Sequence, residues 1–212
     1  MKKIYFVRHG ETEANISNNV YQTPTTPLTQ KGKSQAVIVA ERLATLPIEI
    51  IISSNLTRAK ETVEIIADKL KITIEYSDLF VEVRKPSEVF GKDKDSQIAL
   101  DYKKETKNHY YYSNWHYSDE ESFNELKERA LMALQYLANR SEENILVVTH
   151  AEFLKCMIAC VILGDKLTRE ECEKCIYSLR SENTGITTFD YSAELKNPSW
   201  FLRGWNDHSH LN

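Results

Sequence analysis

The sequence predicts an α/β protein, folded as a three-layer α/β/α sandwich around a mostly parallel central sheet. Short apolar runs alternate along the chain with segments of helical periodicity, a pattern that indicates consecutive βαβ units. The run at residues 48–53 is rich in isoleucine, as expected for a strand that is buried on both faces. With 212 residues, 42% of them hydrophobic, the chain is long enough for one domain with a sizeable insertion.

The first part of the chain is expected to form three strands with two helices between them. Thr29 is suited to cap the first helix, because its hydroxyl can accept a hydrogen bond from the first turn. In the second helix, apolar residues recur at steps of three and four from Leu56 to Leu70. The expected elements are a strand at 3–9, a helix at 29–46, a strand at 48–53, a helix at 55–70 and a strand at 72–76.

The pattern changes from about residue 83 to residue 117. This stretch is polar, with the lysine-rich run 92–95 followed by the aromatic cluster Tyr110-Tyr111-Tyr112, Trp115 and Tyr117. We expect an insertion that forms a helical, aromatic-rich cap over a site, within a single domain spanning 1–212. The aromatic side chains either pack the cap against the body or stack on a substrate.

Regular structure is expected to resume at Ser118. Ser118 and Glu121 have the spacing of a capping box, and so do Thr168 and Glu171 further along. The last two strands are expected at the edge of the sheet. The elements of this part are a helix from 118 to about 137, a strand at 145–149, a helix at 151–163, a helix from 168, and strands at 186–191 and 200–203.

Net charge and the lengths of the apolar runs argue against nucleic acids and membranes as binding partners. A formal net charge of −4 argues against a general nucleic-acid or anionic-membrane surface. No apolar run approaches the roughly 20 residues needed to span a bilayer. The apolar stretch at residues 4–7 is too short for the core of a signal peptide. We therefore expect a cytoplasmic protein that binds neither nucleic acid nor membrane, and the sequence leaves its oligomeric state open.

Four cysteines have a spacing that is compatible with a zinc site: Cys156, Cys160, Cys172 and Cys175. However, Cys156 and Cys160 lie in an almost wholly apolar predicted helix, where free cysteine is a common small core residue. The core interpretation is favoured over zinc. We expect no metal site and no cofactor.

Reactive side chains follow three of the predicted strands. Arg8 and His9 end the first strand, Arg58 comes shortly after the second, and His150 follows the strand at 145–149. The carboxyl ends of parallel strands meet at one edge of a sheet, where ligands bind. Arginine offers a planar fork of donors to an oxyanion, and histidine can act as a nucleophile or as an acid or base. The alternative is that these side chains are only solvated strand ends.

Several short motifs, taken in chain order, point to one family. They are Arg8-His9-Gly10-Glu11-Thr12 with Asn15, Leu28-Thr29 with Gly32 and Gln35-Ala36, Ser53-Ser54 with Arg58-Ala59 and Thr62, Val147-Val148-Thr149-His150, and Asn183-Thr184-Gly185-Ile186. Together they resemble the histidine phosphatase superfamily, also called the phosphoglycerate-mutase-like family. The resemblance covers most of the chain except about 86–117.

The resemblance implies roles for the four convergent residues. His9 would be the nucleophile that takes a phosphoryl group and becomes phosphohistidine. Arg8 and Arg58 would grip the non-bridging oxygens, and His150 would be a further donor. Phosphoryl transfer spreads charge over three equatorial oxygens, so rigid cationic donors are the main contribution that a protein can make.

The resemblance also implies a general acid for the leaving oxygen. The family places a glutamate a few residues after the third strand, and the run Leu79-Phe80-Val81-Glu82 fits that place. Glu82 is therefore the predicted acid, and burial would have to raise its pKa for it to be protonated near neutrality. Glu88 and Glu152 are the competitors.

Two further residues are predicted to bind the phosphate. Asn15 would add a neutral donor, and the backbone N–H of Ala151 stands where many family members have glycine. After Glu82 the chain does not follow the Glu-Arg-x-Tyr-Gly run of the glycolytic mutases. The Arg84 and Lys85 found there either serve an anionic part of the substrate or are solvated.

The prediction is a metal-independent phosphomonoester hydrolase, of the histidine acid phosphatase type, that acts on a small phosphorylated substrate through phosphohistidine at His9. The alternatives are a phosphoglycerate-type mutase, which returns the phosphoryl group to a bound product, and a non-catalytic module that binds a phosphorylated ligand. The sequence does not identify the substrate.

Overall fold

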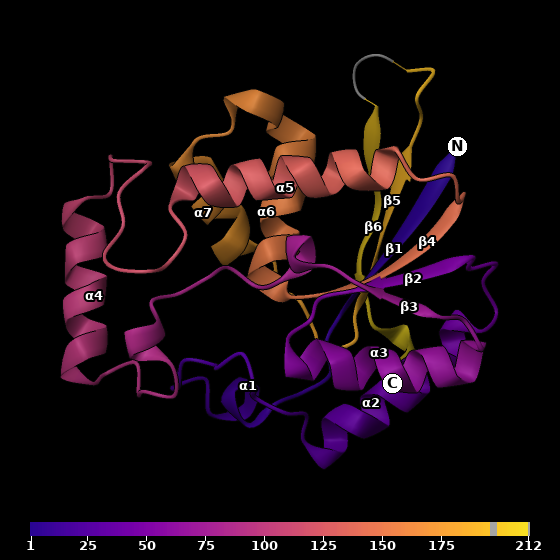
Figure 1. Cartoon of the computed structure of the whole chain (residues 1–212), viewed down its shortest axis with the longest axis horizontal. Coiled ribbons are helices and arrows are strands. Elements are labelled where there is room, and N and C mark those ends of the chain that lie inside the picture. Colours follow the sequence, from indigo (N-terminus) through magenta and orange to yellow (C-terminus); the bar gives the residue numbers. More distant parts are fainter. Residues whose placement is uncertain (196–198, 212) are drawn as a thin grey trace.

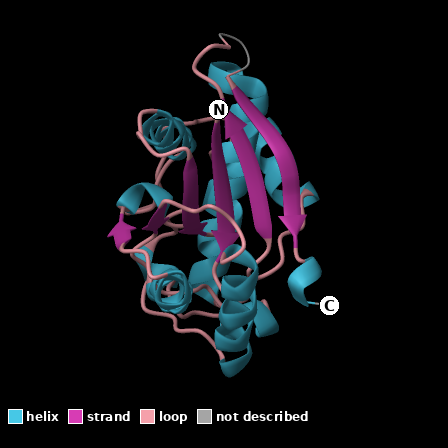
Figure 2. Ribbon diagram, turned by 90° about the vertical axis from the view of Figure 1, so that its right-hand side faces the viewer, coloured by secondary structure: helices cyan, strands magenta, loops and turns pink. Residues whose placement is uncertain are grey.

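A single sheet with helices on both faces forms the body of the protein (Figures 1 and 2). The computed structural model describes residues 1–195 and 199–211. The strands are β1 (Lys2–Arg8), β2 (Ile50–Ser53), β3 (Ile74–Tyr76), β4 (Asn144–Thr149), β5 (Ile186–Tyr191) and β6 (Trp200–Asp207). The α-helices are α1 (Glu13–Ser17), α2 (Gln30–Leu43), α3 (Thr57–Leu70), α4 (Gln97–Asn108), α5 (Phe123–Ala138), α6 (Ala151–Leu163) and α7 (Arg169–Ser178). Short 3₁₀ helices are η1 (Asp78–Phe80), η2 (Ser87–Val89), η3 (Gly164–Lys166) and η4 (Ser209–Leu211).

The strands that the structure describes lie in the order β3-β2-β4-β1-β5-β6. Neighbouring strands from β3 to β1 run parallel, whereas β5 is antiparallel to both β1 and β6. Helices α2 and α3 cover one face of the sheet, and α5, α6 and α7 lie over the other (Figure 1). The three-layer sandwich with a mostly parallel sheet, predicted from the sequence, is confirmed.

Alternating residues of the strands pack into two apolar cores, one on each face of the sheet. In β1, Ile4 and Phe6 point into the core beneath α5 and α6, while Tyr5 and Val7 point into the core beneath α2 and α3. Because consecutive side chains of a strand face opposite sides, an uninterrupted apolar run is what a doubly covered strand requires. Both cores hold the carboxyl ends of β1 and β4 in fixed register, with Arg8 opposite Thr149.

The helix predicted from Ser118 begins later, so its predicted cap is wrong. Ser122 is the N-cap of α5, and it forms the capping box with Glu125: Ser122 Oγ accepts from Glu125 N, and Glu125 Oε2 accepts from Ser122 N at 2.8 Å. Glu120 instead accepts from the backbone N–H groups of Tyr117 and Ser118, which places Ser118 in a turn. The predicted caps of α2 and α7 are confirmed.

Several predicted boundaries shift by a few residues. The helix expected to reach residue 46 ends at Leu43, and the strands expected at 48–53 and 72–76 begin at Ile50 and Ile74. The last strand is longer than predicted and runs to Asp207.

The region predicted to be an insertion contains η2 and α4 and lies to one side of the sandwich (Figure 1). Its aromatic residues pack mainly within the cap or against α7. Trp115 stacks on His109 with ring centroids 4.4 Å apart, and the Arg169 guanidinium lies 4.8 Å from the Tyr110 ring. The Tyr111 side chain is exposed.

The cysteines belong to the core rather than to a cluster of metal ligands. Cys156, Cys160 and Cys172 are buried between α6 and α7, and Cys175 is half-buried beside them. In the described ranges, no group of three or more His, Cys, Asp or Glu residues is arranged to hold a metal ion.

Within the same ranges, no helix has the length and apolar character needed to cross a bilayer.

Candidate active site

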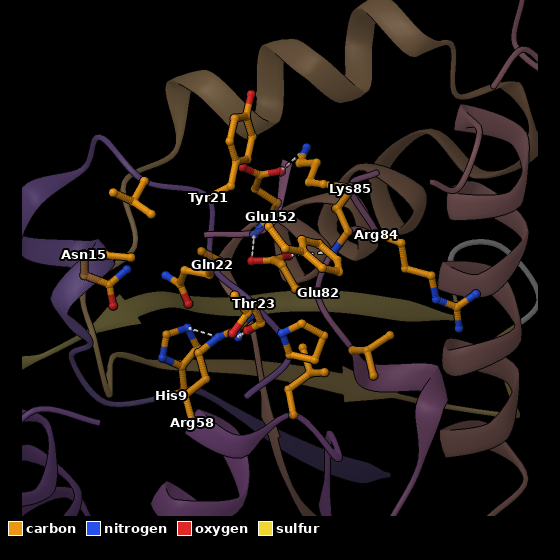
Figure 3. Close-up of a pocket in the computed structure, with 18 of the residues that line it drawn as sticks. His9, Asn15, Tyr21, Gln22, Thr23, Arg58, Glu82, Arg84, Lys85 and Glu152 are labelled. Atoms are coloured by element: carbon orange, nitrogen blue, oxygen red, sulfur yellow. Dashed lines mark hydrogen bonds and ion pairs between the residues drawn. The ribbon is translucent and has the colours of Figure 1, made fainter. Parts of the chain in front are cut away.

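The reactive side chains predicted to converge do so at the carboxyl edge of the sheet. His9 follows β1 and His150 follows β4, and their ring centroids lie 5.2 Å apart. Arg58, in the first turn of α3, places its Nε 3.2 Å from Nε2 of His9. Arg8 is the last residue of β1. A cleft of about 570 Å³ opens over this edge, and Arg8 is among the residues that line it. His9 and Arg58 also line the cleft and are labelled in Figure 3.

His9 is held as a neutral imidazole with one defined tautomer. Its Nδ1 lies 2.7 Å from the carbonyl oxygen of Gly10, and because a carbonyl can only accept, the proton is on Nδ1. The lone pair is therefore on Nε2, where it accepts from Arg58 Nε. Burial lowers the pKa of His9 well below its ordinary value of 6.5, and the Arg58 and Arg8 charges lower it further. At neutral pH the ring offers an unprotonated nitrogen.

Close backbone contacts fix the loop that carries His9. Gly10 N donates to Thr62 Oγ1 at 3.0 Å, and the Thr62 hydroxyl donates to the carbonyl of Arg58 at 2.7 Å, so one side chain ties this loop to α3. A Cβ on Gly10 would lie 2.5 Å from the carbonyl oxygen of Gly32 in α2. Only glycine permits backbones to approach this closely.

The two arginines reach the cleft from different elements, Arg8 from β1 and Arg58 from α3. Arg58 is nearly fully buried, and its Nη1 donates to the carbonyl of Thr23 at 3.1 Å. Burial lowers its pKa to about 10, which leaves it charged at neutral pH. Arg8 donates through Nη1 to the carbonyl of Ser181.

Two buried nitrogens at this edge have no partner among the described residues: Nε of Arg8 and Nδ1 of His150. The other ring nitrogen of His150 lies 2.8 Å from Ser54 Oγ. A buried polar atom without a partner costs roughly 1–3 kcal/mol, so two of them at one sheet edge indicate a site that a ligand completes.

Glu82 lies in the segment after η1, and its carboxyl group rests against the first turn of α6. Its Oε1 accepts from the backbone N–H groups of Val83 and Phe153, both at 2.9 Å, and its Oε2 accepts from Glu152 N at 3.3 Å. Burial raises the pKa of the Glu82 carboxyl, and the nearby Glu152 carboxylate raises it further. The carboxyl is thus placed in the cleft with its proton retained to higher pH than usual (Figure 3).

The other two candidate acids differ from Glu82 in position or charge. Glu152 lines the cleft, but its Oε2 pairs with Lys85 Nζ at 3.0 Å, and the Lys85 ammonium lowers the pKa of Glu152. Glu88 lies exposed in η2 and is not among the residues that line the cleft. Of the three, Glu82 has the environment that a proton donor needs.

Asn15 and Ala151 both line the cleft, as expected of residues that touch a ligand. Asn15 Oδ1 accepts from Thr12 N and from Asn183 Nδ2, each at 3.1 Å. Asn183 Nδ2 also donates to the carbonyl of His9 at 2.9 Å. Sequence reasoning did not assign Asn183 a role, although the Asn-Thr-Gly run before β5 was a usable signal.

Part of the lining comes from residues to which the sequence analysis gave no role. Tyr21, Gln22 and Thr23, in the loop between α1 and α2, line the cleft together with Arg84 and Lys85 (Figure 3). Lys85 forms an ion pair with Glu152, so its ammonium group is neither simply solvated nor available to bind an anion of the substrate.

None of the predicted cap aromatics is among the lining residues, so the packing alternative fits them better than stacking on a substrate. These aromatics are Tyr110, Tyr111, Tyr112, Trp115 and Tyr117.

Comparisons with known proteins agree with this geometry. A family model described as Histidine phosphatase superfamily (branch 1) matches residues 4–208. Curated relatives include proteins named Probable phosphoglycerate mutase GpmB. The one from Citrobacter koseri is 30% identical over 219 residues, and the one from Shigella dysenteriae serotype 1 is 31% identical over 228 residues. Each alignment covers 100% of this chain and 95% of the relative.

Similar solved structures include phosphatases. A mutant phosphoserine phosphatase from Entamoeba histolytica, in complex with phosphoserine, superposes with a TM-score of 0.79 at 24% identity over 100% of both chains. A mycobacterial glucosyl-3-phosphoglycerate phosphatase with VO3 gives a TM-score of 0.74 at 19% identity, over 98% of this chain and 100% of the other. At these identities the likeness shows that the fold is shared.

Proposed function

The chain belongs to the histidine phosphatase superfamily, and we propose that it is a phosphomonoester hydrolase that acts through phosphohistidine at His9. One observation carries the proposal: a neutral imidazole of fixed tautomer contacts the Arg58 guanidinium and shares a cleft with Arg8 and with a carboxyl group of raised pKa. That combination suits phosphoryl transfer, which needs a nucleophile, cationic donors and a proton for the leaving oxygen.

The first step forms the covalent intermediate. The lone pair on His9 Nε2 attacks phosphorus, the N–P bond forms, and the bond from phosphorus to the ester oxygen breaks. Glu82 gives its proton to that oxygen, so an alcohol leaves. Arg58 Nε now occupies the lone pair of His9, so an incoming phosphoryl group has to take over this donor, with Arg8 and His150 as further donors.

The second step returns the protein to its starting state. The Glu82 carboxylate takes a proton from water while the water oxygen attacks phosphorus and the N–P bond breaks. Inorganic phosphate leaves, Nε2 of His9 regains its lone pair, and Glu82 is again protonated. The arginines supply the positive charge throughout, so we propose that activity needs no metal ion and persists in EDTA.

The test is the nucleophile variant His9→Ala, measured on a panel of small phosphomonoesters. His116→Ala is the matched control, because His116 lies exposed in the cap outside the cleft lining. We expect His9→Ala to lose activity on every ester and to lose the acid-labile, base-stable label left by a ³²P-substrate. A His9→Ala protein with full activity, or a wild-type protein that binds esters without turnover, would refute the proposal.

A phosphoglycerate mutase is the second candidate, because the relatives at 30–31% identity over the whole chain carry that name. The run Val83-Arg84-Lys85-Pro86 after the acid departs from the mutase pattern, which favours hydrolysis. Incubation with 3-phosphoglycerate and a trace of 2,3-bisphosphoglycerate separates the two. A mutase forms 2-phosphoglycerate, whereas a hydrolase releases inorganic phosphate.

A further inference from the structure

Arg129 is a buried cation outside the cleft that contacts the segment carrying Glu82. It belongs to α5, is 5% exposed, and is not among the residues that line the cleft. Its Nη1 donates to the carbonyl oxygens of Leu79 at 3.0 Å and Val81 at 2.8 Å, and its Nη2 donates to that of Glu82 at 3.4 Å. One guanidinium thus fixes three carbonyl groups of the four-residue segment that ends in the acid.

Glu121 binds both Arg129 and the segment that follows Glu82, and we call the Arg129–Glu121 pair the clamp. Its carboxylate accepts from Arg129 Nε at 3.0 Å and from Arg129 Nη2 at 2.5 Å. It also accepts from Arg84 N at 2.9 Å, and Glu121 N donates to the carbonyl of Arg84 at 3.3 Å. The Arg129–Glu121 pair therefore holds the backbone both before and after Glu82.

Arg129 also contacts a residue that binds the Glu82 carboxyl group. Its guanidinium carbon lies 4.1 Å from the centre of the Phe153 ring. The backbone N–H of Phe153 donates to Glu82 Oε1 at 2.9 Å. Through this contact, the same side chain restrains both the backbone of the acid and the turn of α6 on which the carboxyl group rests.

The ion pair suits a positioning role better than a role in stability alone. A well-packed apolar pair at a buried site is often at least as stable as an ion pair, so stability does not require these charges. What apolar side chains cannot supply is five directed donors that match several carbonyl groups and a carboxylate at once. Because Glu121 neutralises Arg129, the clamp also places no net positive charge beside a carboxyl group that has to keep its proton.

We infer that Arg129, neutralised by Glu121, is a positioning residue that holds Glu82 in place for proton transfer to the leaving oxygen. The inference rests on the proposed role of Glu82. It predicts that loss of the clamp impairs protonation of the leaving group while the phosphate pocket built by His9 and Arg58 stays intact.

Substrates with different leaving groups isolate that step. p-Nitrophenyl phosphate releases a stable anion that needs no proton, whereas glycerol phosphate releases an alkoxide that does. In Arg129→Met we expect kcat/KM on glycerol phosphate to fall about 10²-fold, within the range of general acid catalysis. We expect kcat/KM on p-nitrophenyl phosphate to fall less than about tenfold, because Arg129 does not line the cleft. The ratio kcat/KM covers the steps up to formation of phosphohistidine, so the later role of Glu82 as a base does not affect it.

One control and a second variant keep the test decisive. Arg140→Met removes another ion-paired arginine, bonded to Glu75 and Glu142, and should leave the ratio of the two kcat/KM values unchanged. Should Arg129→Met fail to fold, Arg129→Lys retains the charge beside Glu121 but loses the planar fork, and should show the same selective loss.

The Glu82→Gln variant separates this inference from the proposed function. A selective loss in Glu82→Gln that is not increased by adding Arg129→Met means that the two residues act in one step. A selective loss in Glu82→Gln alone, with equal losses on both substrates in the Arg129 variants, would overturn the inference and leave the proposed function standing. No selectivity in Glu82→Gln would overturn the role of the acid itself.

Discussion

Replacing Gly32 by alanine tests whether the contact between α2 and the His9 loop fixes the geometry of the site. The new Cβ would overlap the carbonyl oxygen of Glu11 and lie 2.8 Å from its backbone nitrogen. Both obstructing atoms are backbone, so no side chain can turn aside. In an unobstructed helix the same change would stabilise the protein by about 0.8–1.0 kcal/mol. A lower stability of Gly32→Ala therefore indicates that the contact exists, whereas a higher stability indicates that it does not.

The size of the effect follows from these opposing contributions. Overpacking typically lowers the free energy of unfolding by 1–3 kcal/mol, and for a clash with rigid backbone we use the upper value of about 3 kcal/mol. Subtracting the helix gain of about 1 kcal/mol leaves a net loss of about 2 kcal/mol, which lowers Tm by roughly 4–8 °C for a chain of this size. Relief of the clash moves the Glu11 backbone, and with it the adjoining His9 loop. A displacement of about 1 Å can cost about 10²-fold in kcat.

Thermal unfolding and steady-state kinetics on one phosphomonoester measure both effects. Gly204→Ala in β6 is the matched control, because a Cβ there meets no atom within 4 Å. We expect this control to keep kcat and to hold or slightly raise Tm. A Gly32→Ala protein that is as stable as wild type, with unchanged kcat, would refute the reasoning.

Three further predictions concern charge. Arg58→Lys removes the donor that meets His9 Nε2, and we expect kcat to fall by about 10²–10³-fold in steady-state assays. Glu152→Gln removes a charge that raises the pKa of Glu82, so the alkaline limb of the pH–rate profile should move to lower pH. Burial lowers the pKa of both His9 and His150, so the unfolded chain binds more protons below about pH 6.5. Urea unfolding should therefore show stability decreasing below that pH, with a shallower slope in His150→Gln.

The sheet and the convergence of its reactive residues could be predicted because both follow from local patterns of apolar and polar residues in the sequence. The first apolar run stops at Arg8-His9, and a later run stops at His150. Parallel strands with covered faces bring such ends to one edge, so the meeting of the two imidazoles follows from the order of residues. The boundaries of individual elements were predicted less closely, because fraying and capping contacts decide where an element ends, and several of them differ from the prediction by a few residues.

The start of α5 shows why a local pattern can mislead. The run Ser118-Asp119-Glu120-Glu121-Ser122-Phe123-Asn124-Glu125 contains two consecutive capping-box patterns, one from Ser118 and one from Ser122. Nothing within the run distinguishes them. The choice follows from a distant contact, because Glu121 is needed as the partner of Arg129 and as the acceptor for Arg84 N. Both carboxylate oxygens of Glu121 accept hydrogen bonds in these contacts, and the capping box forms at Ser122 instead.

The assignment of roles to two neighbouring carboxylates likewise depends on tertiary contacts. Glu82 and Glu152 both line the cleft, and a backbone N–H of one binds the carboxyl group of the other. Two negative charges this close disfavour each other, so a cation beside one of them decides which carboxyl group stays protonated. Lys85 pairs with Glu152 and keeps it ionised, and Glu152 in turn raises the pKa of Glu82. The lysine that the sequence left open between substrate binding and solvation thus has a third use, which is to determine which glutamate can act as the acid.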